Sequence, residues 1–596
     1  MEPKVYYANR IVELEKKRKG LRRRKSVLGA LRVGTIVAIC AVLYLLWSVG
    51  IFFAIAAGIL LLAVFIRVLF TDLNNQAAIG QLDRLLQVNR DEQLFLQGSF
   101  HQFGDGAAFS HEDHLYANDL DIFGKSSLFQ YLNRTSSEMG SHALADYLKD
   151  PAPAELIRQR QQAVAELPGK MEWIQDLQAA GNRQRLTMAT RDRLESWALE
   201  PPVFSGFRHW RWLRYVLPAI ILTVVTGFAF DAIPARWFYF SLLLFAVIAY
   251  QVNKYVAPIH EQLSRIADEL QICSVTIRQI ENEHFSAPLL QQLQSAFGHS
   301  PHKASHEIRT LQRLLDRLDI RYNILISLPL NLLLLWNLQQ VLGLEKWKAT
   351  RIKNIRAWFD SLGQIEALNS LAVLRFNEPA WVFPEIVPGY FQLQARDMGH
   401  PLITETKRVN NDISIDHSGE LMLVTGSNMA GKSTYLRSAG INVILGMAGS
   451  AVCASTCWMS HVHLVSSMRI ADNLAESTST FYAELKKLKT IIDKVNAGEE
   501  VFILLDEILR GTNSLDRHTG SVALMKQLIR HRAAAMIATH DLELASLIRE
   551  YPENIINYHF DVQVSNDELY FDYRLKPGVC NSMNASILMK KIGIEL

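Results

Sequence analysis

The sequence predicts three kinds of structure in one chain: an α/β domain, an all-α region, and helical hairpins long enough to cross a membrane. In LMLVTGSNMAGKSTYLRSAG, residues 421–440, a glycine-rich loop follows an apolar run and precedes a helix-like segment, as in a phosphate-binding loop. Leucines recur at three- and four-residue spacing in LQRLLDRLDIRYNIL, which is typical of packed helices. From residue 33 to residue 66 the chain carries no charged side chain.

The first 70 residues predict a basic tail followed by a membrane hairpin. Residues 1–32 contain eleven lysines or arginines and three glutamates, a net +8, and the rest of the chain sums to −5. The charge-free run would make a helix of about 51 Å, longer than the roughly 30 Å hydrocarbon layer, and Gly50 lies at its middle. We therefore expect two short spans over residues 33–70. The run is too long for a cleavable signal peptide, and the tail should lie in the cytoplasm against anionic lipid.

A second hairpin is expected over residues 212–254. Residues 215–230 and 237–253 are free of charge, and a short turn that contains Pro234 separates them. Each segment is of marginal length, so a buried core hairpin is the alternative. Aromatic side chains favour the membrane, because they sit where interfacial aromatics are found: Trp210, Trp212, Tyr215, Trp237 and Tyr239.

Helical periodicity fills residues 71–211 and 255–385, on either side of the second hairpin. Within the later region, YNILISLPLNLLLLWNLQQVL, residues 322–342, is long enough to cross a membrane. A fifth span, however, would place the N-terminus and the α/β domain on opposite sides of the membrane, and the asparagines and glutamines of this segment would be costly against lipid. We expect a buried helix of the soluble part here, and four spans in total.

The phosphate-loop pattern predicts how a nucleotide would be held. Glycines allow backbone N–H groups to approach phosphate oxygens, and the following helix adds the positive end of its dipole. Lys432 should reach the β- and γ-phosphates, and the Ser433 hydroxyl should bind Mg²⁺. The loop itself predicts a nucleotide-binding set of Gly426, Ser427, Ala430, Gly431, Lys432, Ser433 and Thr434.

Two more apolar strands end in residues that suit hydrolysis. VFILLDE ends in Asp506 and Glu507; we expect Asp506 to hold Mg²⁺ and Glu507 to activate the attacking water, because carboxylates ending an apolar strand are costly unless a cation meets them. AAAMIATHDLELA ends its strand just before His540, which could contact the γ-phosphate or the water, with a structural role as the alternative. The predicted catalytic residues are Glu507, His540 and Lys432, with ATP and Mg²⁺ as the ligands.

Four segments resemble, in order and spacing, the MutS family of DNA mismatch-repair ATPases: TGSNMAGKSTYLR, DNLAESTSTFYAEL, LLDEILRGTNSLDRHTGS and ATHDLELA. His400-Pro401 and Asn411-Asp412 are similar to elements before the family's phosphate loop. SSLFQYLNRTSSEMGSHALADYLKDP and FDYRLKPG resemble the start of its helical core and its closing segment. The likeness covers most of residues 115–596. It implies an ABC-type ATPase domain with a C-terminal dimerisation segment over residues 386–596, preceded by the family's all-α core and lever.

The resemblance also assigns residues by position. Asn428 and Met429 would belong to the nucleotide loop. Ser479 would reach the γ-phosphate of a partner subunit, in a motif that it shares with Glu484. Asp516 falls in the segment that crosses the family's dimer interface. Arg517, in that segment, stands where the family usually has glycine, and Asn584 replaces a frequent glycine of the family's C-terminal helix-turn-helix region.

The resemblance favours a membrane-anchored ATPase that hydrolyses ATP at composite sites of a homodimer. No counterpart of the mismatch-reading or connector domain is found, so we expect a divergent branch without mismatch recognition. DNA stays a candidate ligand of an ATP-switched clamp, although the net negative charge beyond residue 32 argues against strong DNA binding. The alternatives are an ABC-type transporter, whose LSGGQ-like helix is missing before Asp506, and a membrane-remodelling ATPase without DNA binding. We expect a multi-pass protein of the cell membrane, with the ATPase domain and both termini in the cytoplasm.

Cysteines and histidines predict no further chemistry. The cysteines show no paired spacing and are expected to be reduced, buried thiols: Cys40, Cys273, Cys453, Cys457 and Cys580. One loop segment contains side chains of the kinds that bind metals: His111, His114, Asp119 and Asp121. We favour scattered polar loop residues over a metal site.

Overall fold

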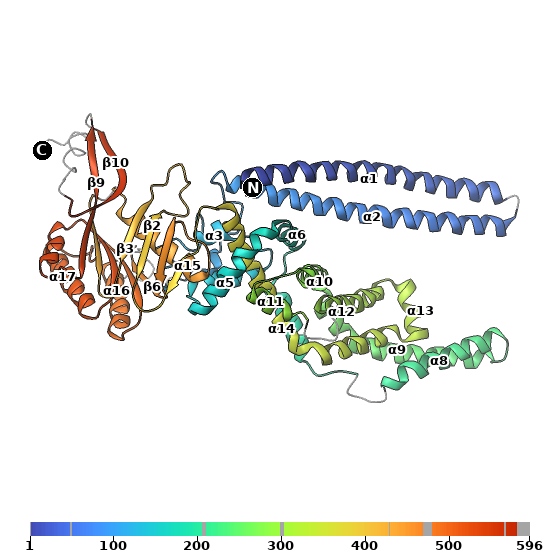
Figure 1. The fold of residues 1–596 in the computed structure, drawn as a ribbon. Coiled ribbons are helices and arrows are strands. Elements are labelled where there is room, and N and C mark those ends of the chain that lie inside the picture. The colour runs from blue at the N-terminus through green and yellow to red at the C-terminus, as the bar shows by residue number, and fades with distance from the viewer. Residues whose placement is uncertain are drawn as a thin grey trace.

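The computed structural model describes residues 2–47, 50–111, 113–204, 210–298, 303–427, 430–468, 480–565 and 568–580. The described chain has three regions (Figure 1): a long helical hairpin, a helical body from which a second hairpin projects, and a C-terminal α/β domain. Both hairpins point away from the α/β domain, and the N-terminus lies at the base of the first hairpin, beside the body.

The first hairpin consists of α1 (Pro3–Trp47) and α2 (Ile51–Phe95), with Gly50 between them as predicted. Residues 3–32 of the basic segment are not a separate tail, because they continue into the first apolar stretch as one helix. The charge-free residues form the outer end of the hairpin, and the charged parts of both helices, residues 3–32 and 67–95, form a stalk below it. Arg32 and Asp72 mark the boundary, with Nη1 and Oδ2 2.8 Å apart.

The helical body packs around α14 (Trp336–Asn377), which ends next to the α/β domain. Glu366 of α14 is buried and accepts hydrogen bonds from the hydroxyls of Ser136 and Ser137 at the start of α4. Burial raises the pKa of the Glu366 carboxyl. The shorter elements of the body are η1 (Ala107–Phe109), α3 (Leu128–Leu132), α4 (Glu138–Lys149), α5 (Ala154–Glu166), η2 (Leu167–Lys170), α6 (Met171–Gly181), α7 (Met188–Leu199), α10 (Ala267–Asn282), α11 (Pro288–Ser295), α12 (Ala304–Asp319) and η3 (Ile320–Tyr322).

The second hairpin consists of α8 (Trp210–Ala229) and α9 (Ala235–Ser264). Many of its large apolar side chains are exposed, which contradicts the alternative of a buried core hairpin; among them are Leu222, Leu243, Leu244 and Val247. By length and composition alone, four helices of the described chain could cross a membrane: α1, α2, α8 from Trp212 onward, and α9. A fifth crossing would arise only if α13 (Ile324–Leu334) and the first part of α14, a sharply bent pair, were one span.

Residues 322–342 do not form the single buried helix that we expected. The segment breaks at Leu335, whose φ of 47° is left-handed, and α13 and α14 meet there at 77°. Leu338 in α14 is buried, whereas Ile324 and Leu325 in α13 are exposed. The prediction was therefore wrong for residues 324–334. The sequence could not reveal this, because a continuous apolar run has no periodicity to mark a covered face.

None of the five cysteines is in a disulfide bond. Four are buried as expected, and burial raises the pKa of the Cys273 and Cys457 thiols to about 12. Cys40 is exposed on the outer end of the first hairpin, so the expectation of a buried thiol was wrong there. Site-directed labelling of this protein therefore requires that Cys40 be replaced first.

The α/β domain contains two sheets. The smaller has the strand order β1-β5-β2-β3 and the larger β10-β9-β4-β8-β7-β6. Every residue of β4, β7 and β8 is buried, as expected for central parallel strands. The predicted combination of an α/β domain with a largely helical region is confirmed at this level. The elements are β1 (Glu385–Val387), β2 (Leu393–Met398), β3 (Asn411–Ile415), β4 (Leu421–Thr425), α15 (Lys432–Ala448), β5 (Thr456–Ser460), β6 (His463–Ser467), α16 (Thr480–Asn496), β7 (Val501–Asp506), α17 (Ser514–Arg530), β8 (Ala534–Thr539), η4 (Leu542–Arg549), β9 (Ile555–Ser565) and β10 (Glu568–Pro577).

Two aspartates tie the body to helices of the α/β domain. Asp119 Oδ2 lies 2.6 Å from Lys487 Nζ in α16 and accepts a hydrogen bond from the Ser466 hydroxyl. Asp121 Oδ2 lies 3.1 Å from Arg437 Nη1 in α15. These carboxylates, which a metal site could have used, are therefore engaged by protein groups.

A buried polar network joins the base of the stalk to the body. Glu92 in α2 forms an ion pair with Arg134, and each side chain is only 3% exposed. Glu92 Oε2 also accepts a hydrogen bond from Asn377 Nδ2 at the end of α14, at 2.8 Å. The Tyr7 hydroxyl of α1 donates to Asn377 Oδ1 at 2.8 Å. Because an unpaired buried charge is costly, this network fixes both stalk helices to the end of α14.

We expect Arg134→Ala to loosen the base of the stalk. The substitution leaves the Glu92 carboxylate buried without its cation, which should lower the local opening free energy by roughly 3–5 kcal/mol. Hydrogen exchange at the amides of α2 near Glu92 and of α14 near Asn377 measures this opening. Arg90→Ala is the matched control: it breaks the Arg90–Glu15 pair, whose side chains are 48% and 45% exposed, and should change exchange by no more than about 0.5 kcal/mol. Equal effects of the two variants would contradict the assigned role.

Candidate nucleotide-binding site

Three parallel strands of the larger sheet end at one edge, and the predicted site residues follow them. β8 lies between β4 and β7, with Thr425 opposite Thr539 and Asp506 opposite Ala538. The phosphate-loop segment follows β4, Glu507 follows β7, and His540 follows β8. Ligands of α/β proteins bind at such carboxyl-end edges. Three segments that are far apart in the sequence thus meet at one place.

The phosphate-loop segment closes onto the N-terminus of α15. A Cβ on Gly426, whose φ is 141°, would lie 2.8 Å from the Phe560 carbonyl oxygen, so only glycine fits there. Lys432 is buried, and its Nζ donates to the carbonyl oxygens of Gly426 and Ser427 at 2.7 and 2.8 Å. Burial lowers the pKa of this ammonium group. Ala430 is also buried. The predicted loop residues that fall outside the described residues are Asn428 and Met429.

The acidic end of β7 faces the start of α15. Burial raises the pKa of the Asp506 carboxyl, and a hydrogen bond from Ser433 and the charge of Arg510 oppose that shift. Asp506 Oδ1 is buried and accepts no hydrogen bond among the described residues. Glu507 Oε2 lies 3.0 Å from Arg510 Nε. The Asp506 oxygen lies 4.0 Å from Arg510 Nη2. A carboxylate oxygen without a hydrogen bond, beside a serine hydroxyl, is a donor set that suits Mg²⁺, so Ser433 and Asp506 fit the ion that the sequence predicts.

His540 lies beside Glu507. Its Nδ1 is 3.7 Å from Glu507 Oε1. The turn that carries His540 is fixed from α17, because His518 Nδ1 lies 2.8 Å from Asp541 Oδ2, and the Asp541 amide donates to Thr539 Oγ1 at 3.0 Å. The sequence analysis missed His518, because no spacing rule predicts that a residue of α17 packs against the turn that follows β8.

The loop after β7 has a conformation that neighbouring groups maintain. Glu507 and Leu509 have φ values of 47° and 60°, which are uncommon for residues other than glycine. Glu484 in α16 accepts a hydrogen bond from the Leu509 amide, and a Cβ on Gly511 would meet Phe481 at 2.5 Å. Burial raises the pKa of the Glu484 carboxyl. Glu484 thus positions the loop that follows the acidic pair, while Ser479 lies outside the described residues.

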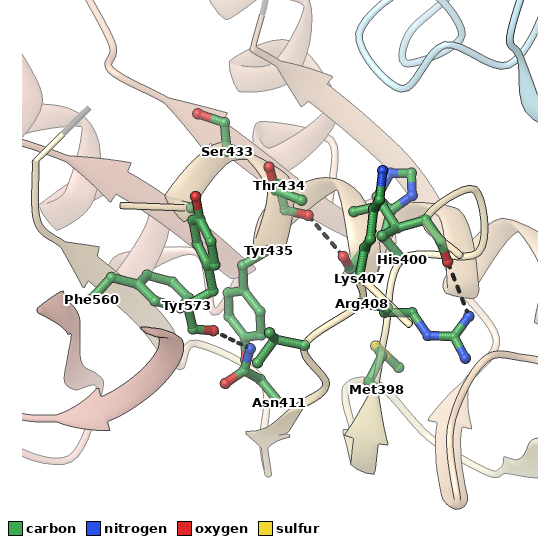
Figure 2. A pocket seen from close by; sticks show the side chains of 14 residues that line it. Met398, His400, Lys407, Arg408, Asn411, Ser433, Thr434, Tyr435, Phe560 and Tyr573 are labelled. Carbon is green, nitrogen blue, oxygen red and sulfur yellow. Dashed lines mark hydrogen bonds between the residues drawn. The ribbon is translucent and has the colours of Figure 1, made fainter. Parts of the chain in front are cut away.

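A pocket of about 330 Å³ adjoins the phosphate loop. Figure 2 shows aromatic rings on one side of it and basic side chains on the other. Burial, with the charge of Arg437, lowers the pKa of His400 to about 4, so a neutral imidazole lines the pocket. Of the residues that line the pocket, the sequence analysis had singled out Gly431, Ser433 and Thr434 in the phosphate loop and His400 and Asn411 before it. It missed the other side chains that give the pocket its character: Lys407, Arg408, Tyr435, Phe560 and Tyr573.

The pocket and the loop together have the dimensions and chemistry of a nucleotide site. Aromatic walls suit a base, and small-molecule sites typically occupy 300–1,000 Å³. The glycine cradle, the buried Lys432 and the helix N-terminus suit phosphates. The class that these features define is a nucleotide-binding α/β domain.

Comparisons with known proteins point to a family. Residues 422–592 match the family described as MutS domain V. Over 238 residues the chain is 32% identical to the DNA mismatch repair protein MutS of Persephonella marina, covering 39% of this chain and 27% of that protein. Over 221 residues it is 34% identical to that of Aquifex pyrophilus, covering 36% and 25%. Residues 422–592 are therefore similar to domain V of MutS proteins, and the matched part spans only about a quarter of the length of these relatives.

Tyr573→Ala should weaken nucleotide binding without disturbing the phosphate loop. Loss of a ring from the pocket wall should cost roughly 1 kcal/mol, about fivefold in Kd, measured by titration with a fluorescent ATP analogue. Tyr570→Ala on the same strand is the control, because Tyr570 is 61% exposed and does not line the pocket. Unchanged affinity in Tyr573→Ala would mean that the base binds elsewhere.

Proposed function

We propose that this protein is a membrane-held ATPase that works as a homodimer and transmits nucleotide-driven movement to its hairpins. The observation that carries the proposal is that Lys432, after β4, meets Asp506 and Glu507, at the end of β7, at one edge of the larger sheet, with β8 between the two strands. The similarity to domain V of MutS proteins supports ATP as the nucleotide. The membrane part is supported by hairpins whose apolar side chains are exposed.

Each side chain of the site has a role in hydrolysis. Lys432 is placed to exchange its two carbonyl contacts for phosphate oxygens. Ser433 and Asp506 would hold Mg²⁺, which neutralises phosphate charge when bound. Glu507 takes the proton of the attacking water, and Arg510 and His540 keep its carboxylate oriented. Donors that are fixed before the reaction stabilise the charge that develops on the γ-phosphate.

A dimer is supported by apolar side chains around the loop that follows β7. Tyr482 and Leu485 on α16 and Leu515 on α17 are exposed, and exposed apolar clusters mark interaction surfaces. Glu484, between the first two, holds that loop from within the subunit. A partner that covers this face would bring its own Ser479 segment to the site, as the family resemblance implies.

The membrane and DNA are different ligands for the basic charge of this chain. Exposed basic side chains gather on the stalk below the apolar end of α1: Lys16, Lys19, Arg23, Arg24 and Lys25. Their place next to a potential span favours anionic lipid. The two relatives carry names that refer to DNA mismatch repair, and DNA is therefore the second ligand of this proposal, bound by its phosphates. We do not propose that this chain reads mismatches.

Glu507→Gln should keep nucleotide binding and reduce ATP turnover at least about 100-fold, because it removes the base and preserves the shape of the side chain. Lys432→Ala should instead weaken binding, since it removes the buried ammonium group. Phosphate release and equilibrium binding of an ATP analogue separate the two effects. Turnover at the parent rate in Glu507→Gln would refute the assignment of the base.

Mixing Ser479→Ala with Lys432→Ala protein should restore part of the activity. If Ser479 completes the partner's site, a mixed dimer has one site with both lesions and one intact site, whereas each homodimer has only defective sites. ATP turnover of the mixture measures the recovery, and crosslinking shows whether mixed dimers have formed. No recovery in a mixture that contains them would mean that Ser479 does not act across the dimer.

A further inference from the structure

The first half of α13 arranges its side chains in the opposite way from a helix on a water-soluble surface. Ile324, Leu325 and Leu328 are exposed, Leu325 to 83%, while Ser327 is buried. Asn331, one turn later, also turns inward: its Nδ2 donates to the Ser327 carbonyl at 2.9 Å, and its Oδ1 accepts from the next helix at 2.9 Å. A surface helix normally buries its apolar face and exposes its polar face. This reversal indicates an apolar medium over α13.

α13 lies beside the second hairpin at the end that is nearer the helical body. Asn337, just beyond α13, donates from Nδ2 to Asn253 Oδ1 at 3.1 Å, and Gln339 Nε2 donates to the Arg214 carbonyl at 2.6 Å. Asn253 is the last residue of the charge-free part of α9, and Arg214 directly precedes that of α8. α13 contacts both helices and runs across their direction (Figure 1). The helix therefore sits where the charge-free part of the hairpin begins.

The length of α13 decides between crossing and lying in a membrane. Its 11 residues rise about 16 Å, half of the roughly 30 Å hydrocarbon layer. The bend of 77° at Leu335 prevents α14 from extending it as a straight span. Two polar side chains that would be costly against lipid make hydrogen bonds within the protein: Asn331 Oδ1 accepts from the Asn337 amide, and Asn337 Nδ2 donates to Asn253.

We propose that α13 is embedded in the cytoplasmic leaflet of the bilayer, parallel to the membrane plane, without crossing it. This inference rests on the proposed function, in which the hairpins cross the membrane. The exposed aliphatic side chains enter the acyl region, and the exposed ring of Tyr322 at the N-terminal end meets the interface. α13 then fixes the depth and tilt of the body, so that movement of the α/β domains acts on the bilayer and not only on two flexible anchors.

The test uses the full-length protein, with Cys40 replaced by alanine, reconstituted in phospholipid vesicles. An environment-sensitive fluorophore is attached at Leu325→Cys. Leu243→Cys at mid-hairpin is the lipid control, and Arg313→Cys on α12 is the water control; both positions are exposed. A variant without an added cysteine reports any labelling of the four buried thiols. Quenching is measured with iodide in water and with lipids that carry a nitroxide at a shallow or a deep position.

We expect the label at residue 325 to emit further to the blue than the label at residue 313 and to lose its quenching by iodide. The shallow nitroxide should quench it more than the deep one, with the reverse order at residue 243. Iodide access at 325, with 243 in lipid, would overturn the placement of α13 and leave the hairpins in the membrane. Protection at 325 from both iodide and lipid quenchers would mean that protein, such as a second copy of the chain, covers α13.

Two further outcomes would also overturn the inference. Deep quenching at residue 325, together with labelling of Lys346→Cys from the outer side, would make the segment a fifth span. Iodide access at residue 243 would show that the second hairpin itself is outside the bilayer, in which case the proposed membrane attachment fails and the inference fails with it.

Discussion

The buried ion pair between Glu92 and Arg134 is the contact that holds the stalk against the helical body, and the proposed coupling between the two ends of the molecule depends on it. Such pairs seldom stabilise a protein more than apolar packing would, but the loss of one partner is costly. The pair therefore fixes which part of α2 lies against the body. Asn377 and Tyr7 extend the same network to the end of α14 and to α1, and β1 of the α/β domain begins only a few residues after Asn377.

The nucleotide site is joined to the body by a second set of contacts. α15, which begins at Lys432, carries Arg437, the partner of Asp121, and α16, which carries Glu484, also carries Lys487, the partner of Asp119. In the proposed mechanism, movement of either helix on nucleotide binding would reach the body through these ion pairs. Coupling of this kind requires an element with two arrangements that both sites bias. In our account, that element is the closure of two α/β domains over shared nucleotide.

Where local pattern decides the structure, the sequence was enough to name candidate site residues that the fold brings to one edge of the sheet. An apolar strand followed by a glycine loop located Lys432, and VFILLDE located Asp506 and Glu507, because each motif is contiguous. Residues brought in by topology, such as Tyr573 and His518, could not be found in this way. The same holds for the network of the stalk, in which Glu92 and Asn377 are 285 positions apart.

The helical hairpins show where the limit of pattern reasoning lies. Gly50 and the change from charged to uncharged residues predicted the first turn and the outer end of α1 and α2. The uniform apolar run that became α13 has no period, so the sequence could not tell a covered helix from an exposed one. Only the inward orientation of Ser327 and Asn331 distinguishes the two.

The most direct test of the account is a pair of distance measurements on vesicle-reconstituted Glu507→Gln protein by double electron–electron resonance, with and without ATP. Labels at the exposed positions Lys19 on the stalk and Lys489 on α16, in dimers diluted with unlabelled protein, report the distance within a subunit. A label at Lys19 alone reports the distance between the two stalks. The account predicts that ATP changes the distance between stalks and leaves the distance within the subunit unchanged. A change within the subunit, with the stalks fixed relative to one another, would contradict it.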